Sequence, residues 1–330
     1  MDMGIRYIVT GAAGHLGSTV IRLLQNTDSE VYGLLLPEEK PVIKAPNIHY
    51  VHGDVCRKET LSPLFENADG KTVKVIHTAG IISIEREVSP LVYEVNVNGT
   101  KNMIHICREK EVDGFVYVSS VHAIPEMAYR ETIYETGFFS AASVVGGYAK
   151  TKAEATQSVL DASRKGLQAV IVHPSGIIGP YDKGNNHLVQ LVIEYMNGKL
   201  PVCVKGGYDF VDVRDVAAGC LLAAEKGKQG QCYILSGHYL SIQDMLSCAG
   251  KYCNKKKLPA IPVFLAEFAA PWIESFSRIC GKRALYTRYS LHTLTSNSNF
   301  SSSKARTELG YFSRPADDTI RDMTGWIMEN

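Results

Sequence analysis

The sequence predicts an α/β fold, a doubly wound parallel sheet with a smaller, mostly helical region placed over it. In the first half, short apolar runs alternate with segments of helical periodicity. The apolar runs are rich in β-branched residues and show no polar alternation, which is typical of parallel strands covered on both faces. After about residue 174, glycine and proline interrupt the chain often, and only short helices and isolated strands follow. We therefore expect a main domain over residues 1–180 and a smaller region over 181–330, with the chain crossing back to the main domain around 209–235.

The individual elements follow from the same patterns. Strands are expected at residues 5–10, 31–35, 48–51, 73–77, 115–119, 169–173 and 232–235. Helices are expected at residues 16–25, 58–65, 91–108, 147–164, 304–309 and 316–328, with Gly310 ending the fifth of these. The apolar window 258–273 is interrupted by prolines, and we interpret it as a buried helix with an irregular entry. A membrane-surface or partner-binding element is the alternative.

The overall composition excludes several classes of protein. A chain of 330 residues with 45% hydrophobic and 21% charged residues is expected to be globular rather than disordered. The formal net charge of +1 gives no general attraction to nucleic acid or to an anionic membrane, so neither is expected as a partner. The basic run at 255–257 is interpreted as a solvated helix end, with a binding patch as the alternative. No stretch reaches the roughly 18 apolar residues of a membrane span.

The cysteines indicate a reduced compartment. The sequence has eight, without a C-x-x-C pair and without the cysteine–histidine spacing of a zinc site, so no metal is expected. Scattered single cysteines act as small core residues in a reducing environment. The N-terminus has no charged-then-apolar leader. We therefore expect a cytoplasmic protein.

A glycine-rich segment, Thr10-Gly11-Ala12-Ala13-Gly14-His15-Leu16-Gly17, follows the first expected strand and opens the first expected helix. In this context Gly11 permits a tight turn, Gly14 lets the backbone approach a pyrophosphate, and Gly17 allows the helix to pack closely on the sheet. Free N–H groups and the helix dipole favour phosphates at such an N-terminus. The segment predicts a Rossmann-type dinucleotide site, to which Thr10, Ala13, His15 and Leu16 also belong.

The end of the second expected strand decides which dinucleotide binds. An acidic residue there would bond the ribose 2′-hydroxyl of NAD, and an arginine would take the 2′-phosphate of NADP. This sequence has Leu36, followed by Glu38, Glu39, Lys40 and Lys44. The missing carboxylate favours NADP(H), with Lys40 or Lys44 as the phosphate partner and Leu36 beside it, and NAD(H) is the alternative. Both lysines also fit as solvated loop charges.

Two further strand ends are expected at the cofactor. Asp54 and Val55 follow the third strand, where Asp54 either receives the adenine amino group or caps the helix at 58–65. Thr78, Ala79 and Gly80 follow the fourth strand, and their small size lets a cofactor lie across the strand ends. The preceding His77 is expected to be a packed histidine.

The strongest chemical signal is the pair Tyr148 and Lys152, which lie four residues apart and share one helix face. A neighbouring lysine favours the phenolate, lowers the tyrosine pKa from about 10 and prepares the hydroxyl for acid–base catalysis. Ser120 closes the fifth strand, where its hydroxyl can bond a substrate oxygen. Asn96 is locally unfavourable inside a helix. We explain it by a water chain to Lys152 or by a helix kink.

These segments occur in the order found in the extended short-chain dehydrogenases/reductases, which the sequence resembles over nearly its whole length. The matching segments are 10–17, 53–55, 77–80, Asn96, 119–120, 148–152, 173–180, 210–217 and 303–311. The resemblance implies that Ser120 polarises the substrate, Tyr148 transfers the proton, and Lys152 holds the nicotinamide ribose and lowers the tyrosine pKa. It also implies that Pro174, Gly176 and Ile177 meet the nicotinamide carboxamide. A homodimer through the helices at 91–108 and 147–164 is expected by the same analogy.

Within this NAD-dependent epimerase/dehydratase superfamily, the sequence is most similar to the dihydroflavonol reductase and 3-beta-hydroxysteroid dehydrogenase branch. Val121-His122-Ala123 follows the serine pair where sugar-nucleotide epimerases commonly carry Val-Tyr-Gly. His122, Ala123, Phe138 and Tyr208 are the expected lining of an apolar substrate pocket, with ordinary loop packing as the alternative.

We therefore expect an NAD(P)-dependent oxidoreductase, such as a ketone reductase, that acts on a carbonyl or secondary alcohol of a small apolar molecule. One alternative is a sugar or nucleotide-sugar epimerase that retains NAD, for which Arg214, Arg278 and Arg283 are the candidate diphosphate ligands. The other is a non-catalytic regulator that senses the dinucleotide.

Overall fold

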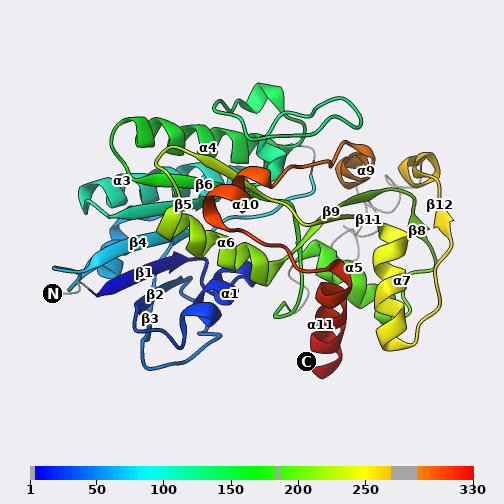
Figure 1. Ribbon diagram of the computed structural model, residues 1–330, viewed down its shortest axis with the longest axis horizontal. Helices are drawn as coiled ribbons and strands as arrows, with labels where there is room; N and C mark the ends of the chain where they lie inside the picture. Colours follow the sequence, from blue (N-terminus) through cyan, green and yellow to red (C-terminus); the bar gives the residue numbers. More distant parts are fainter. Residues whose placement is uncertain (1–3, 86, 183–185, 269–287) are drawn as a thin grey trace.

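Seven parallel strands form the main sheet of the protein. The computed structural model describes residues 4–85, 87–182, 186–268 and 288–330. The strand order is β10-β6-β5-β4-β1-β2-β3 (Figure 1). The strands are β1 (Ile5–Thr10), β2 (Glu30–Leu35), β3 (Ile48–His52), β4 (Thr72–His77), β5 (Gly114–Val118), β6 (Ala169–Pro174) and β10 (Cys232–Leu235). Because the order reverses between β1 and β4, the sheet is doubly wound, which confirms the predicted fold class.

Helices cover both faces of this sheet (Figure 1). They are α1 (His15–Leu24), α6 (Val213–Lys226) and α10 (Ser303–Leu309) on one face, and α3 (Thr100–Glu109) and α4 (Gly147–Arg164) on the other. Successive strand residues face separate cores, since Tyr7 and Val9 pack with α1 and α6, whereas Ile8 belongs to the core under α3 and α4. Burial on both faces explains why the strands are apolar without alternation.

A smaller region lies at one end of the main sheet (Figure 1). Its strands are β7 (Gly176–Ile178), β9 (Gly207–Asp212) and β11 (His238–Ser241) in one sheet, and β8 (Cys203–Val204) and β12 (Ala260–Ile261) in another. Its helices are α5 (His187–Met196), α7 (Ile242–Cys253), α9 (Arg288–Thr295) and α11 (Ala316–Glu329). The chain between these elements returns to the main domain, because α6 packs on α1 and β10 pairs with β6. Residues 181–330 are therefore divided between the two parts.

Two expected helices differ from the structure. Residues 58–65 form two short 3-10 helices, Lys58–Thr60 and Ser62–Phe65, because Pro63 has no N–H to continue a helical ladder. The expected helix at 91–108 is α2 (Pro90–Tyr93), a π-helical turn (Glu94–Gly99) and then α3. The π turn contains Asn96, at the position where the sequence indicated a kink.

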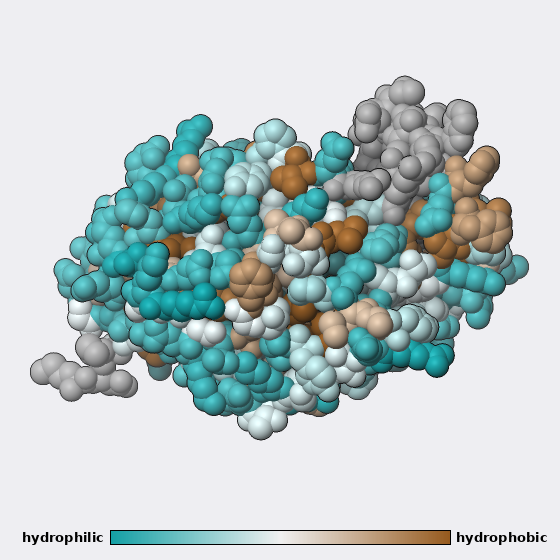
Figure 2. Space-filling model, turned by 90° about the horizontal axis from the view of Figure 1, so that it is seen from above, coloured by the Kyte–Doolittle hydropathy of each residue, from teal (hydrophilic) through white to brown (hydrophobic). Residues whose placement is uncertain are grey.

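The apolar window at 258–273 is not a buried helix in its described part, which corrects that interpretation. β12 pairs with β8, and the helical residues that follow leave Phe264 65% and Phe268 80% exposed. Residues 269–273 lie outside the described residues. Figure 2 shows hydrophobic residues gathered at this end of the molecule. In the part of the chain that the structure describes, every helix is too short or too polar to cross a membrane.

Candidate active site

A cavity of about 750 Å³ opens where the main sheet meets the smaller region. Its sheet half comes from the carboxyl ends of the main-sheet strands and the loops after them, together with the start of α1 and the adjoining strand β7. These residues are Gly11, Gly14, His15, Leu16, Gly17, Leu36, Glu39, Asp54, Val55, Thr78, Ala79, Gly80, Pro174, Gly176 and Ile177. Its cap half is contributed by the smaller region, namely Leu188, Leu191, Tyr208, Tyr289, Thr293 and Leu294. Ser120, His122, Tyr148 and Lys152 also line it. The carboxyl ends of parallel strands are where open α/β sheets bind ligands.

The glycine loop is shaped by close contact between backbone atoms. Gly14 N–H donates to the Gly11 carbonyl at 3.0 Å, and a Cβ at Gly17 would lie 2.1 Å from the same oxygen. No side chain fits at Gly17, so α1 begins directly against the turn, with its N-terminal residues lining the cavity. The free N–H groups of that helix end fit the pyrophosphate of a dinucleotide.

Thr10 and Ala13 were predicted at the cofactor, but neither lines the cavity. Thr10 is fully buried, and its hydroxyl accepts from Ala79 N–H at 3.1 Å and bonds the His77 ring at 2.7 Å. These bonds join the ends of β1 and β4. His77 is a packed histidine, whose pKa burial lowers to about 3.

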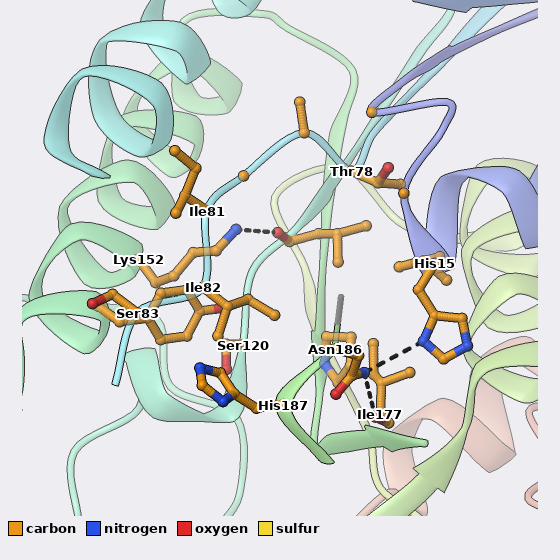
Figure 3. Close-up of a pocket in the computed structure, with 18 of the residues that line it drawn as sticks. His15, Thr78, Ile81, Ile82, Ser83, Ser120, Lys152, Ile177, Asn186 and His187 are labelled. Carbon is orange, nitrogen blue, oxygen red and sulfur yellow. Dashed lines mark hydrogen bonds between the residues drawn. The ribbon is translucent and has the colours of Figure 1, made fainter. Parts of the chain in front are cut away.

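His15 connects the glycine loop to the smaller region. Its Nε2 bonds the Pro180 carbonyl at 2.8 Å, and Asn186 reaches its Nδ1 at 3.3 Å. The Asn186 amide also donates to the Ile177 carbonyl at 2.8 Å (Figure 3). The predicted cofactor residue His15 therefore holds the two walls of the cavity together, and Asn186 is a partner that the sequence analysis missed.

The turn after β2 brings a carboxylate to the sheet half of the cavity. Glu39 N–H donates to the Leu36 carbonyl at 3.0 Å, and its Oε2 accepts from Leu36 N–H at 2.9 Å. Leu36 and Glu39 both line the cavity. Lys40 and Lys44 are exposed and do not line it, so they take the solvated positions that were the alternative. The place predicted for a cation therefore holds an anion.

Asp54 and Val55, which were predicted at the cofactor, line the cavity, but Asp54 does not cap a helix. Its Oδ1 accepts from Cys56 N–H at 2.9 Å, which folds the chain into a local turn. The first 3-10 helix begins after Arg57, without a side-chain cap. The helix-cap alternative for Asp54 is therefore wrong, and its carboxylate stays at the cavity.

The three predicted catalytic side chains meet at this cavity. α4 carries Tyr148 and Lys152, which are 8% and 5% exposed, and Ser120 follows β5. Lys152 Nζ donates to the Val118 carbonyl at 2.8 Å (Figure 3). Ser119 bonds Thr156 of α4 at 2.6 Å, whereas Ser120 hydrogen-bonds Tyr148.

Burial shifts the pKa values of Tyr148 and Lys152. It raises the pKa of Tyr148 to about 12, and the hydrogen bond with Ser120 lowers that pKa only in part. Burial also lowers the pKa of Lys152 to about 7. The pKa of Tyr148 therefore moves in the direction opposite to the lowering that the sequence predicted from Lys152. The phenolate is disfavoured in a buried environment, and the Lys152 Nζ donates to the Val118 carbonyl.

Asn96 acts on the loop after β4. Its Oδ1 accepts from Ile81 N–H at 2.8 Å, and its Nδ2 donates to the Ile81 carbonyl at 3.0 Å and to Thr151 at 3.1 Å. A Cβ at Gly80 would lie 3.3 Å from Asn96 Oδ1 and 3.5 Å from Lys152 Nζ. Asn96 thus holds the cavity wall beside Lys152, at a π-helical turn that accounts for its unfavourable position.

The four predicted substrate residues have different surroundings. His122 and Tyr208 line the cavity and stack with ring centroids 5.6 Å apart. Ala123 is fully buried in the core under α3 and α4, and Phe138 is 65% exposed on the surface. Ala123 and Phe138 are therefore wrong as pocket residues, because the Ala123 side chain packs into the core and the Phe138 ring lies on the surface, and neither lines the cavity.

The sequence analysis missed most of the cap half. Leu188, Leu191, Tyr289, Thr293 and Leu294 come from α5 and α9, far along the chain from the catalytic residues. They are ordinary helix residues without a motif, and only the three-dimensional fold brings them to the cavity.

Comparison with known proteins identifies the family. Residues 7–236 match the NAD dependent epimerase/dehydratase family. The chain belongs to this family. Among its relatives, sterol demethylase protein B of Methylococcus capsulatus is 26% identical over 98% of both chains. The 3-beta-hydroxysteroid dehydrogenase of Mycolicibacterium neoaurum is 27% identical over 94% of this chain and 87% of its own length. The crystal structure of gox2253 superimposes with a TM-score of 0.81 at 30% identity, covering 100% of this chain and 98% of the other.

Membership of this family means that the relatives of the chain include NAD-dependent dehydrogenases, reductases and epimerases. A nicotinamide dinucleotide as cofactor agrees with the glycine loop, the Lys152 environment and the small residues after β4. The predicted kinship with the extended short-chain dehydrogenases/reductases is thereby confirmed.

Proposed function

We propose that the protein is an oxidoreductase that moves hydride between a nicotinamide dinucleotide and a carbonyl or secondary-alcohol carbon of a small, mainly apolar molecule. The observation that carries this proposal is the meeting of Ser120, Tyr148 and Lys152 in the same cavity as the glycine loop. A phenol acid, an amine and a hydroxyl donor at one place are the groups needed to stabilise an oxygen that gains charge.

The chain's own residues would perform the proton chemistry. When bound, the nicotinamide supplies or accepts the hydride. Ser120 and Tyr148 would bond the substrate oxygen, and Tyr148 would donate its proton to that oxygen as the carbonyl is reduced. Since burial raises the pKa of Tyr148 to about 12, the phenol starts in its protonated form, which favours reduction. The Lys152 Nζ, which keeps N–H donors in both of its protonation states, would hold the ribose beside Gly80.

The lining of the cavity favours an apolar substrate over a nucleotide sugar. Among the described residues, Lys152 is the only lysine or arginine that lines the cavity, so the diphosphate of a sugar nucleotide has no arginine partner there. Arg214 is bound to Asp212 at 2.7 Å and to Asp322 at 2.8 Å. Arg278 and Arg283 lie outside the described residues. The cap half instead presents leucines and aromatic rings.

The reaction can be tested by incubating the protein with NADH or NADPH and a panel of apolar ketones and aldehydes. A reductase consumes NADH or NADPH in proportion to product. An epimerase that retains NAD shows no net consumption, and a regulator binds the dinucleotide without turnover. Steady cofactor consumption with at least one carbonyl compound supports the proposal, and its absence across the panel contradicts it.

We further propose NAD(H) as the cofactor, although the sequence alone favoured NADP(H). Glu39 lines the cavity with one carboxylate oxygen held by Leu36 N–H, and Lys40 and Lys44 are exposed. A fixed carboxylate accepts hydrogen bonds from ribose hydroxyls and repels a 2′-phosphate.

Glu39→Gln tests this choice, with the neighbouring exposed Glu38→Gln as the matched control. We expect Glu39→Gln to weaken NADH binding by about tenfold, the scale of one charge-assisted hydrogen bond, and to improve binding of NADPH relative to NADH. Fluorescence titration gives both dissociation constants without a substrate. Tighter binding of NADPH than NADH by the wild type would contradict the proposal.

We also propose that the protein is a cytoplasmic homodimer that uses the α3 and α4 face. His105, on α3, has a side chain that is 60% exposed and does not line the cavity. Light scattering during size-exclusion chromatography tests this, because His105→Glu should convert a dimer of this kind to a monomer.

A further inference from the structure

Three buried phenols surround one imidazole where the cap half joins the catalytic residues. The ring centroid of His122 lies 6.2 Å from those of Tyr148 and Tyr289, and 5.6 Å from that of Tyr208. Two of the phenols have partners, since Tyr148 bonds Ser120, and Tyr208 lies 3.1 Å from His122 Nε2. The Tyr289 hydroxyl has no hydrogen-bond partner among the described residues, although this side chain is only 7% exposed.

An unpartnered buried hydroxyl is unfavourable, and native proteins retain few of them without a use. Tyr289 is fixed by packing against the backbone. Gly146 has a φ of +98°, and a Cβ there would lie 2.2 Å from Tyr289 Cε2. The ring therefore lies against the residue that precedes α4, two positions before Tyr148, and it lines the cavity.

The Tyr289 hydroxyl is a permanent donor. Burial first, and then electrostatic coupling to Tyr148 and to the carboxylate of Glu126, raise the pKa of Tyr289 above its ordinary value. The side chain thus keeps its proton at physiological pH. His122 cannot act as a cation beside it, because burial, aided by His292, lowers the pKa of His122 to about 4. Neutral partners fit such a cluster better than charged ones.

We propose that the Tyr289 hydroxyl donates a hydrogen bond to a second oxygen of the substrate, besides the reacting oxygen at Ser120 and Tyr148. The substrate class is then a carbonyl compound with a neighbouring oxygen, such as a hydroxy ketone, a diketone or a keto ester. Its apolar remainder packs on Leu188 and Leu294. This inference rests on the proposed function and names the substrate class of the same site.

Tyr289→Phe is the test, because it removes the hydroxyl and leaves the ring on Gly146. The measurement is the ratio of kcat/KM within matched pairs: benzoin against deoxybenzoin, and ethyl acetoacetate against the alkyl ketone of the same length. We expect the wild type to prefer the oxygenated member by about tenfold, the scale of one hydrogen bond, and Tyr289→Phe to lose this preference. If another carbonyl compound is the best substrate, the ratio is measured on it and on its analogue without the second oxygen.

Thermal unfolding of the free protein separates a binding role from a structural one. Tyr208→Phe is the matched control, since it removes a hydroxyl that has a partner in the protein. We expect Tyr208→Phe to lower the Tm and Tyr289→Phe to keep or raise it.

Any of four results would overturn the inference: no wild-type preference within the pairs, full preference in Tyr289→Phe, equal losses of Tm in both variants, or a best substrate without a second oxygen. Failure of the wild type to turn over any carbonyl compound is a different result, because it removes the proposed function itself.

Discussion

The two halves of the cavity are formed by different parts of the chain: backbone and small residues in one, large side chains in the other. The sheet half is made largely of backbone and small residues, whose places are fixed by contacts such as Gly17 against the Gly11 carbonyl and Thr10 against Ala79 N–H. The cap half is made of large side chains on α5, β9 and α9. The first arrangement allows few residue types at each position, whereas the second accepts many apolar ones. Binding of a common cofactor and choice of a particular substrate are thereby separated within one cavity.

Tyr148 lies between the halves, and its loss should produce the largest effect. Tyr148→Phe removes the proton donor but keeps the ring, so we expect turnover to fall by about 10²–10⁴-fold, the range of general acid catalysis. Dinucleotide affinity should stay within a few-fold, because the glycine loop and Glu39 are untouched. Turnover with a ketone substrate and fluorescence titration of NADH check the two statements. Wild-type turnover in this variant would remove Tyr148 from the mechanism.

The same contrast explains what the sequence alone could predict about the site. Gly11, Gly14 and Gly17 form one short segment whose spacing follows from backbone geometry, and all three line the cavity. Tyr289 and Leu188 have no such constraint, and they reach the site through packing contacts far apart in the sequence. Phe138 shows the opposite failure, because an aromatic residue near the catalytic serine suggested a pocket but lies 65% exposed.

The fold could be predicted more fully than the site, for a similar reason. Burial of the main strands on both faces left an apolar pattern in every one of them, so β1 to β6 and β10 were predicted close to their observed bounds. The prediction of a buried helix around Phe264 was wrong because apolar composition alone does not distinguish a core helix from a surface helix. The sequence analysis gave Glu39 no role at the cofactor, because its place at the cavity depends on a turn that returns its carboxylate to Leu36 N–H.

Replacement of Lys152 should give the next largest effect, and this effect on the free energy of unfolding can be measured without any cofactor. Its pKa is about 7 in the folded protein and about 10.4 in an unfolded chain. At a pH between these two values, the folded state has released this proton and the unfolded state still holds it. The free energy of unfolding should therefore rise with pH across this range. Relative to Lys152→Met, the wild type should gain about 1.4 kcal/mol per pH unit, an order-of-magnitude figure, from about pH 7 to 10. Denaturant unfolding of both proteins across this range checks it, and parallel curves would mean that Lys152 keeps an ordinary pKa.

Asn96 tests whether the sheet half depends on side chains as well as backbone, and it should give the smallest effect. Asn96→Ala leaves the N–H and carbonyl of Ile81 without their partner, so we expect a loss of about 1–3 kcal/mol in the free energy of unfolding. Dinucleotide affinity should fall a few-fold, because Gly80 and Ile81 line the cavity. Asn98→Ala is the control from the same π turn, since Asn98 bonds only Glu94, at the surface, among the described residues. Equal behaviour of the two variants would show that the loop after β4 keeps its shape without Asn96, and that backbone contacts alone build the sheet half.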